Sequence, residues 1–498
     1  MKNNYTKIEL KIPTSVLIAT QTLKNKGFSA YLVGGCVRDS LMNRPPKDWD
    51  ITTNAKPEDI IKTFPKTVYE NKFGTVTIVN EELAEKFNNL KNIEVTPYRR
   101  ESTYSDQRHP DEVEFCDQLE DDLSRRDFTI NALAYDPDNN DLIDLYDGVR
   151  DIKDKIIRTV GNPDKRFQED ALRLLRAIRF AAELNFVLDP KTQGSITQNA
   201  KLITKTSVER IRDEFVKIIM STNPVRGIRL MSNCGLLKYI IPELEKGIGM
   251  EQGGEHIYDV WEHTLLSTQH AAEKNWPLHV RLAALLHDIG KIKTRRPGEK
   301  GSKTWTFYGH EVFSERMTRN ILGKLRFPVK LTETVLKLVR NHMFFSDPDK
   351  ITLSAVRRII AKVGPDLIWD LMNLRICDRI GMGRPKEEPY RLRKYQSMIE
   401  EALRAPTSVG MLKIDGNQIM KVTHETPGPK IGMVLNALME EVLDKPELNT
   451  KKYLEKRAVK LIELPINTLE KLAQKGKDRR GEIEEKELIK IRGKYRVK

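Results

Sequence analysis

The chain has 498 residues, of which 39% are hydrophobic and 31% are charged, and its formal net charge is +14. This length suggests about three domains, and the balance of apolar and charged residues excludes a sparse disordered chain. No run approaches the ~20 consecutive apolar residues of a membrane-spanning helix, and we expect no signal peptide at the N-terminus. The positive charge is typical of proteins that bind a polyanion, although solubility alone would also account for it.

The four cysteines are widely spaced and form no CxxC pair: Cys36, Cys116, Cys234 and Cys377. This spacing argues against a disulfide framework and against a thiolate zinc site. A reducing cytoplasm is the simplest location for such a chain.

The N-terminal part is predicted to be an α/β domain over residues 1–148. An apolar run at 28–35 predicts a strand that ends at Gly34-Gly35, and similar runs follow at 49–53, 75–79 and 93–98. These strands alternate with short helical patterns, which favours a small mixed sheet.

The remaining chain is predicted to be all helical, which makes the fold class α+β. Apolar residues recur at helical spacing over 171–186 and 207–220. Glycine-rich breaks at 247–256 and 381–389 predict three further domains, whose expected bounds are 149–245, 246–385 and 386–498. The charged tail from Lys475 predicts a solvated helix or a disordered arm.

Two carboxylates mark the first candidate site. Asp48 and Asp50 flank Trp49 at the start of a predicted strand, so they project from the same face. Carboxylates held in this way can bind Mg²⁺ ions, which coordinate a triphosphate and activate a 3′-hydroxyl. Upstream, Gly34 and Gly35 would let the backbone approach a phosphate closely. Each feature alone also occurs in ordinary turns.

The motifs together resemble class II tRNA nucleotidyltransferases, the family of bacterial CCA-adding enzymes and poly(A) polymerases. The segments that carry the resemblance follow in order: YLVGGCVRDSLMNRPPKDWDITT, DLSRRDFTINALAYD, LIDLYDGVRDIKDK, RFQEDALRLLRAIRFAAEL and SVERIRDEF. The resemblance implies that Asp48 and Asp50 are the catalytic, Mg²⁺-binding pair and that Glu94 is a third carboxylate. It also implies a set of nucleotide-binding residues: Gly35, Arg38, Arg126, Asp170, Arg173, Arg176 and Arg179.

The predicted helix after residue 170 suggests how the nucleotide is selected. Asp170 and Arg173 are three residues apart, so we expect them to be neighbours on one helix face. An Asp–Arg pair can satisfy the amino and ring-nitrogen groups of cytosine and adenine while rejecting guanine and uracil. Arg176 and Arg179 step around the helix and are better placed for phosphates. An amphipathic helix with solvated arginines is the alternative.

The segment at 99–115 resembles the flexible loop that CCA-adding enzymes need for the switch from C to A addition. The matching residues are Tyr104, Asp106, Arg108 and Pro110. The segment therefore favours an enzyme that adds both nucleotides. A polar connecting hairpin is the alternative.

A second candidate site lies between residues 263 and 378. Its candidate ligands are four histidines and two aspartates in helical or helix-adjacent, apolar contexts: His263, His287, Asp288, His310, His342 and Asp378. Imidazole and carboxylate together suit transition metals. With Gly290 and Lys291 the pattern resembles the HD phosphohydrolase superfamily. The resemblance implies that His263, His287, Asp288 and Asp378 surround one divalent ion, a transition metal or Mg²⁺, and that His310 and His342 extend the site to a second.

Residues 411–454 resemble the C-terminal module of many CCA-adding enzymes, in which Pro427, Gly428 and Pro429 would set a helix N-terminus. The resemblance as a whole implies an enzyme that adds CCA to tRNA from CTP and ATP with Mg²⁺. We expect the C-terminal body to contact the tRNA elbow through Lys and Arg on phosphates. A poly(A) polymerase is the nearest alternative. An HD phosphohydrolase with a non-catalytic nucleotide-binding or RNA-binding head is another, and a non-catalytic RNA-binding protein a third.

Overall fold

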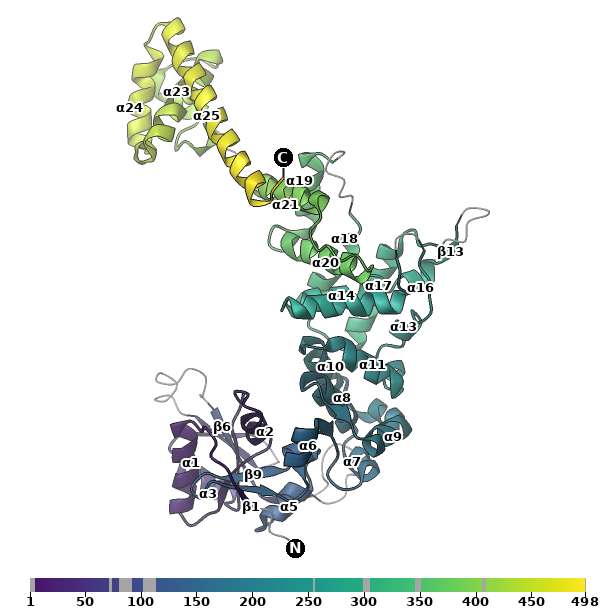
Figure 1. The fold of residues 1–498 in the computed structure, drawn as a ribbon. Coiled ribbons are helices and arrows are strands. Elements are labelled where there is room, and N and C mark those ends of the chain that lie inside the picture. The colour runs from purple at the N-terminus through teal and green to yellow at the C-terminus, as the bar shows by residue number, and fades with distance from the viewer. Residues whose placement is uncertain are drawn as a thin grey trace. The chain divides into compact units, whose positions relative to one another are not determined.

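The computed structural model describes residues 5–70, 74–79, 92–101, 113–253, 256–298, 305–344, 351–404 and 409–497 (Figure 1). The chain forms two compact units. The first comprises residues 1–342 with 373–384, and the second comprises 343–372 with 385–498. The four-domain division made from the sequence stays a prediction.

The first unit begins with one mixed sheet of eight strands in the order β1-β10-β9-β2-β3-β6-β5-β4. Its strands are β1 (Tyr5–Lys7), β2 (Ala30–Val33), β3 (Asp50–Thr53), β4 (Thr67–Glu70), β5 (Thr75–Val79), β6 (Asn92–Pro97), β9 (Leu133–Asp136) and β10 (Asp141–Asp144). Only β3 and β6 run parallel, and their register places Asp50 opposite Glu94. The predicted mixed sheet is confirmed.

Short helices cover the sheet. They are α1 (Thr14–Asn25), α2 (Gly35–Leu41), α3 (Pro57–Thr63), α5 (Leu119–Ser124), the single turn η1 (Thr129–Asn131) and α6 (Gly148–Asp154), and a separate ribbon pairs β7 (Arg99–Glu101) with β8 (Val113–Phe115). Apolar residues of α1, α2 and α3 pack with Leu32 and Ile51 in the main core. Leu123 of α5 packs on Val33 in a smaller cluster. Figure 1 shows α1 and α3 beside the sheet.

The next part of the first unit is mostly helical. It contains α7 (Pro163–Glu169), α8 (Leu172–Glu183), α9 (Pro190–Asn199), η2 (Ala200–Lys205), α10 (Val208–Met220), α11 (Pro224–Asn233), α12 (Leu237–Ile240) and α13 (Pro242–Glu245). Helix α8 buries its apolar face against α10 and α11. Gly227 lets α11 approach α10 closely, because a Cβ there would lie 2.4 Å from the Ile218 side chain. One parallel pair, β11 (Ile156–Ile157) with β12 (Val187–Leu188), departs from the all-helical prediction.

The rest of the first unit is a helical cluster around α15 (Leu278–Leu286), whose residues from Val280 to Leu286 are all buried. Helices α14 (Val260–Glu273) and α18 (Val329–Asn341) pack against α15. The same part of the unit contains α16 (Lys291–Thr294), α17 (His310–Lys324) and the C-terminal part of α20 (Ile368–Gly381). A second departure from the all-helical prediction is the ribbon β13 (Arg296–Pro297) with β14 (Trp305–Thr306). It joins α16 to α17.

The second unit contains only helices among its described residues: α19 (Leu353–Val363), α21 (Tyr390–Leu403), η3 (Val409–Met411), α22 (Gly416–Thr423), α23 (Pro429–Asp444), η4 (Pro446–Leu448), α24 (Lys451–Ile462) and α25 (Ile466–Lys494). Helix α23 begins at Pro429 with Gly428 as N-cap, which confirms the predicted helix start. The core lies among α22, α23, α24 and the start of α25.

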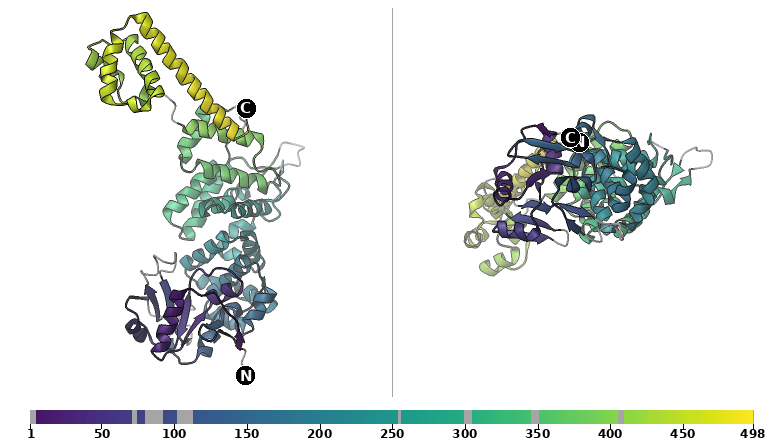
Figure 2. Two further views of the ribbon diagram at one scale, coloured as in Figure 1. Left: turned by 60° about the vertical axis from the view of Figure 1, so that its left-hand side comes forward. Right: turned by 90° about the horizontal axis from the view of Figure 1, so that it is seen from below.

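The charged tail forms the long helix α25 (Figure 2), which confirms the helical alternative for it. The helix is not solvated along its whole length. Gly476 is buried against α23, where a Cβ would lie 2.1 Å from the carbonyl oxygen of Asn436. At the other end, Lys494 and Tyr495 hydrogen-bond Glu400 of α21 at 2.7 Å each. Across the described ranges, no helix combines the length and apolar character needed to cross a membrane.

Candidate functional site

The first candidate site is a pocket of about 610 Å³ in the first unit, where α2 and β3 face α8 and α10. Arginine, lysine and carboxylate side chains dominate its wall. The predicted site residues that line it are Gly35, Arg38, Asp48, Asp50, Arg126, Arg176 and Arg179. A volume of this order is typical of a small-molecule site.

Asp48 and Asp50 both line the pocket because Trp49 between them turns into the core, where it is 4% exposed. Burial, and then the charges of Glu94 and Asp48, raise the pKa of Asp50 to about 6, even though Arg126 opposes the shift. The crowding of carboxylates therefore favours a cation beside Asp50. Glu94 acts from the next strand, which agrees with its predicted place as a third carboxylate.

The glycine pair positions the start of α2. Gly34 has a φ of +82°, which glycine adopts readily, and a Cβ there would lie 3.1 Å from Nη1 of Arg126. From α2, Arg38 reaches the pocket and donates a hydrogen bond to Oδ1 of Asn131 at 2.7 Å. The glycines thus allow Arg126 and Arg38 to converge on one space.

Two functional residues were missed from the sequence, although the RRDFTINA motif contains both. Asp127 accepts hydrogen bonds from Arg176 Nε at 2.8 Å and from Asn131 Nδ2 at 3.2 Å. Burial would raise the pKa of Asp127, but the charges of Arg176 and Arg173 outweigh it and lower the pKa to about 2. Asp127 and Asn131 therefore link Arg38 to Arg176 across the pocket wall.

An aromatic ring lies among the pocket arginines. The Phe180 ring centroid is 4.1 Å from the guanidinium carbon of Arg179, 5.2 Å from that of Arg38 and 5.5 Å from that of Arg176. Arg179 also pairs with Glu214 of α10 at 2.7 Å. These contacts hold the guanidinium groups in place before any ligand binds.

The prediction that Asp170 and Arg173 share a helix face is wrong. Helix α8 begins at Leu172, and Asp170 has an extended backbone, with φ −140°, because its carboxylate accepts the N–H of Leu172 at the helix start. Arg210 of α10 binds both carboxylate oxygens of Asp170, at 3.2 and 2.8 Å. Arg173 instead binds Glu169 and the carbonyl oxygen of Arg125. Neither Asp170 nor Arg173 lines the pocket, and their role in nucleotide selection stays a prediction.

The predicted loop residues Tyr104, Asp106, Arg108 and Pro110 lie outside the described residues. The flanking strands β7 and β8 pair antiparallel, with Arg99 opposite Phe115.

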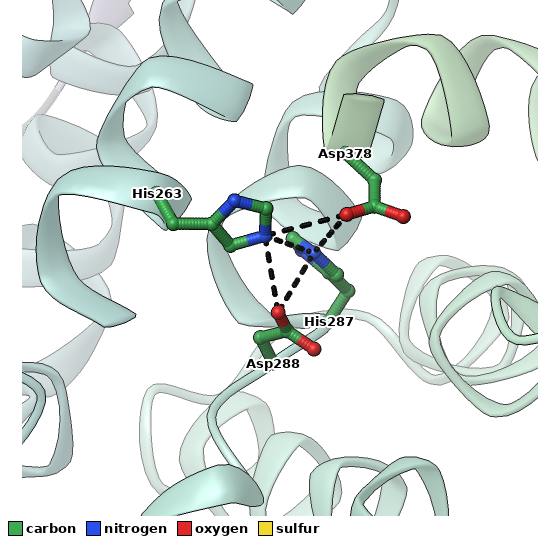
Figure 3. Close-up of side chains that lie close together, drawn as sticks. All are labelled: His263, His287, Asp288 and Asp378. Carbon is green, nitrogen blue, oxygen red and sulfur yellow. Dashed lines mark hydrogen bonds and ion pairs between the residues drawn. The ribbon is translucent and has the colours of Figure 1, made fainter. Parts of the chain in front are cut away.

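The second candidate site is a buried cluster in the first unit (Figure 3). His263 comes from α14, His287 and Asp288 directly follow α15, and Asp378 comes from α20. One ligand atom from each residue lies within 4.8 Å of the others. Nε2 of His263 lies 3.0 Å from Nε2 of His287, 3.0 Å from Asp288 and 3.4 Å from Asp378.

Asp288 also belongs to a second group, with His310 at the start of α17 and His342 just after α18. The two groups use different oxygens of the same carboxylate. Oδ2 lies 3.0 Å from His263, and Oδ1 lies 3.1 Å from His310. Asp288 can therefore bridge two cations through its two oxygens, whereas the sequence predicted only that His310 and His342 extend the site to a second ion.

The histidine rings are oriented by backbone carbonyls. Nδ1 of His287, His310 and His342 lies 2.9, 2.9 and 2.7 Å from the carbonyl oxygens of Ala284, Phe307 and Val339. If each Nδ1 carries the proton, each Nε2 keeps a lone pair. Nε2 of His310 then faces Nε2 of His342 at 3.2 Å, and the two lone pairs could bind one shared cation.

Positively charged neighbours keep the carboxylates of the cluster ionised. Burial would raise the pKa of Asp288, but Lys291 and His287 outweigh it and hold that pKa well below its usual range. Nζ of Lys291 is 2.6 Å from Asp288, and Arg375 is 2.6 Å from Asp378. The described residues thus provide two groups of His and Asp that can hold metal ions.

Comparisons with known proteins match three parts of the chain. Residues 30–158 match the family described as Poly A polymerase head domain, residues 185–248 match "Probable RNA and SrmB- binding site of polymerase A", and residues 260–379 match the HD domain. These matches confirm the resemblance predicted from the motifs. The three matches follow one another along the chain in the order head domain, polymerase A segment and HD domain.

Curated relatives and a solved structure agree with these matches. A CCA-adding enzyme of Ligilactobacillus salivarius is 45% identical over 220 residues, which are 44% of this chain and 52% of that protein. One of Lactobacillus helveticus is 49% identical over 199 residues, 40% of this chain and 48% of the relative. The chain therefore spans about half the length of the curated relatives it matches. The Bacillus stearothermophilus CCA-adding enzyme in complex with CTP has 28% identity and a TM-score of 0.58, covering 90% of this chain and 96% of that one.

Proposed function

We propose that this chain, which carries the poly A polymerase head domain, adds the sequence CCA to the 3′ ends of tRNA by transferring CMP and AMP from CTP and ATP. The observation that carries the proposal is the carboxylate pair Asp48 and Asp50 at the edge of a pocket lined by arginines. The motif order, the sequence relatives and the CTP-bound structural neighbour support the same activity.

Mg²⁺ bound by Asp48 and Asp50 would supply charge neutralisation and activation of the attacking 3′-hydroxyl. The residues fit that ion because the raised pKa of Asp50 reflects burial and carboxylate crowding that a cation would relieve. Arg38, Arg126 and Arg176, which line the same pocket, would bind the triphosphate, since guanidinium groups match phosphate geometry. Asp127 and Asn131 hold Arg176 and Arg38 in that geometry.

The proposal includes selection of the base by Asp170 and Arg173, a role that the family resemblance implies for both residues. Each side chain has a protein partner in this structure, namely Arg210 and Glu169. Nucleotide binding would exchange these partners for the base edge. Replacing Arg210 by alanine should therefore change the ratio of correct to incorrect nucleotide addition.

The test is a 3′-extension assay with purified protein, Mg²⁺ and a tRNA that lacks its CCA end, with product lengths read at single-nucleotide resolution. The proposal expects two added residues with CTP alone and a stop after the third when ATP is also present. A long adenosine ladder on any RNA would instead establish a poly(A) polymerase. Absence of any addition would contradict both activities of the head.

We also propose that the HD domain is a metal-dependent phosphohydrolase. The two linked His/Asp groups carry this second proposal. A divalent transition metal or Mg²⁺ held there would supply a nucleophile from water at neutral pH. Asp288, His287 and the neighbouring Lys291 would hold the ion and the phosphate charge. Measuring bound metal, and hydrolysis of bis(p-nitrophenyl) phosphate with added divalent ions, tests it. A protein that binds no metal in either group would refute it.

The second unit is proposed to bind tRNA through phosphates. A pocket of about 770 Å³ there is lined by α23, α24 and α25, and three exposed lysines on it form no ion pair among the described residues: Lys445, Lys456 and Lys460. Their charge complements a phosphate backbone. A cytoplasmic location stays a prediction from the cysteine pattern, and all four cysteines are free thiols in the structure.

A further inference from the structure

The ribbon of β13 and β14 connects two helices whose first residues border the His/Asp cluster of the HD domain. It leaves α16, whose first residue Lys291 lies 2.6 Å from Asp288, and it enters α17, whose first residue is His310. The carbonyl oxygen of Phe307, just before α17, contacts Nδ1 of His310 at 2.9 Å. Both ends of the ribbon are therefore fixed by residues that border the candidate metal site.

The described part of the ribbon presents aromatic rings and positive charges together. The guanidinium carbon of Arg295 lies 3.7 Å from the centroid of the Trp305 ring. Tyr308 is 87% exposed, which is unusual for so large an aromatic side chain. We call Lys293, Arg295, Arg296, Trp305 and Tyr308 the ribbon surface.

Among the described residues, the positive charge of the ribbon surface has no acidic partner. Lys293 and Arg296 are exposed, and neither forms an ion pair within the described ranges. Arg295 stacks on Trp305, and its Nε has no hydrogen-bond partner there. The surface therefore offers cations to an external anion, and it offers the Tyr308 ring to a flat apolar group.

Single-stranded nucleic acid combines these two chemistries, because its bases stack on aromatic rings and its phosphates bind cations. We propose that the ribbon surface binds single-stranded RNA and holds the RNA's 3′-terminal phosphate group at the HD cluster. Tyr308 lies two residues before His310, so their Cα atoms are at most about 7 Å apart, which is roughly the length of one nucleotide. The ribbon surface makes an RNA end, rather than a small phosphate ester, the preferred substrate.

This inference rests on the proposed HD phosphohydrolase activity, so the experiment separates the two. Hydrolysis is measured on an RNA octamer that ends in a 2′,3′-cyclic phosphate and on bis(p-nitrophenyl) phosphate. The variants are Tyr308→Ala and the double change of Lys293 and Arg296 to Ala. Matched controls are Tyr308→Phe, which keeps the ring, and Lys330→Ala, which removes an exposed lysine of α18 that forms no ion pair with any described residue.

Tyr308→Ala is expected to raise KM for the RNA at least about fivefold, because it removes a ring on which a base stacks, and the double change should raise KM as well, because it removes two charges that bind phosphates. Hydrolysis of bis(p-nitrophenyl) phosphate by both variants should stay within about twofold of the unmodified protein, as should both controls on both substrates. An unchanged KM for RNA in Tyr308→Ala would overturn the inference and leave the phosphohydrolase intact. An equal rise for both substrates would also overturn it, because it would show a damaged metal cluster.

A second measurement covers the case in which neither substrate is hydrolysed and the HD activity itself fails. An RNA octamer with 5-iodouridine at its 3′ end is photocrosslinked to the full chain, and the crosslinked peptide is identified by mass spectrometry. The inference expects crosslinks at Trp305 or Tyr308. Crosslinks only elsewhere would refute it, and so would full competition by polyglutamate, which would identify an acidic protein as the partner.

Discussion

Replacing Asp127 by asparagine tests the organisation of the nucleotide pocket. The carboxylate is buried and pairs with Arg176 at 2.7 Å, and its pKa falls from the ordinary 3.8 to about 2. That difference corresponds to about 2 kcal/mol of stabilisation of the folded protein at neutral pH. Asparagine keeps the shape and the hydrogen bond from the Phe128 N–H, but it loses the charge. We therefore expect Asp127→Asn to lower the free energy of unfolding of the head by about 2 kcal/mol.

The pH dependence follows from the direction of the shift. Because the pKa of Asp127 is lower in the folded than in the unfolded state, the stabilisation is fully present above about pH 5. It is lost as the pH falls from about 4 through about 2. The difference between the two proteins should therefore be constant from pH 6 to pH 8 and should shrink below pH 4.

The assay must report the first unit alone, because a chain with two compact units need not unfold in one step. Trp49 is buried in the head core and is one of five tryptophans. Labelling with 5-fluorotryptophan gives Trp49 its own ¹⁹F resonance, which can be followed through a urea titration and assigned with Trp49→Phe. Asp138→Asn is the matched control, since Asp138 forms an exposed pair with Lys24 whose loss should cost at most about 1 kcal/mol.

Coupling to Arg176 is the decisive comparison. In a background with Arg176→Gln, the effect of Asp127→Asn should fall to less than half, because the two side chains act as a pair. An effect below about 0.5 kcal/mol in the unmodified protein, or an undiminished effect in the Arg176→Gln background, would refute the reasoning.

Four further changes test the remaining conclusions. Asp48→Ala or Asp50→Ala should abolish CCA addition in the extension assay while leaving bis(p-nitrophenyl) phosphate hydrolysis unchanged, and substantial retained addition would contradict the metal role. Asp378→Asn should reduce metal bound to the HD domain, measured by mass spectrometry of the desalted protein, without slowing CCA addition. Gly476→Ala should destabilise the second unit in thermal unfolding, because its Cβ would meet the Asn436 carbonyl oxygen at 2.1 Å, whereas Gly481→Ala has open space and should not. Replacing Lys445, Lys456 and Lys460 together by alanine should weaken tRNA binding. The slope of log K against log salt concentration should fall by about one for each lysine, and an unchanged slope would exclude these lysines from the phosphate contacts.

Local sequence patterns were sufficient to predict those features of the candidate sites that depend on residues close together along the chain. Asp48 and Asp50 both line the pocket, as their spacing predicted, although β3 begins only at Asp50; burial of Trp49 between them turns the two carboxylates to the pocket side. The Gly34-Gly35 turn needs a positive φ at Gly34, which the sequence indicates by residue type alone. The His and Asp residues of the HD domain were recognisable because charged or imidazole side chains are rarely buried in apolar helices unless they have a partner.

Tertiary structure decided the features that depend on residues distant in sequence. Sequence spacing placed Asp170 beside Arg173, but the carboxylate is bound by Arg210 of α10, whose SVERIRDEF motif gives no sign of this distant partner. Asp127 became recognisable as a pocket residue only when α8 brought Arg176 against it. The same holds for the ribbon surface, where the pairing of β13 with β14 sets Trp305 under Arg295. Sequence determines which side chains can do chemistry, whereas packing determines which of them already have a partner.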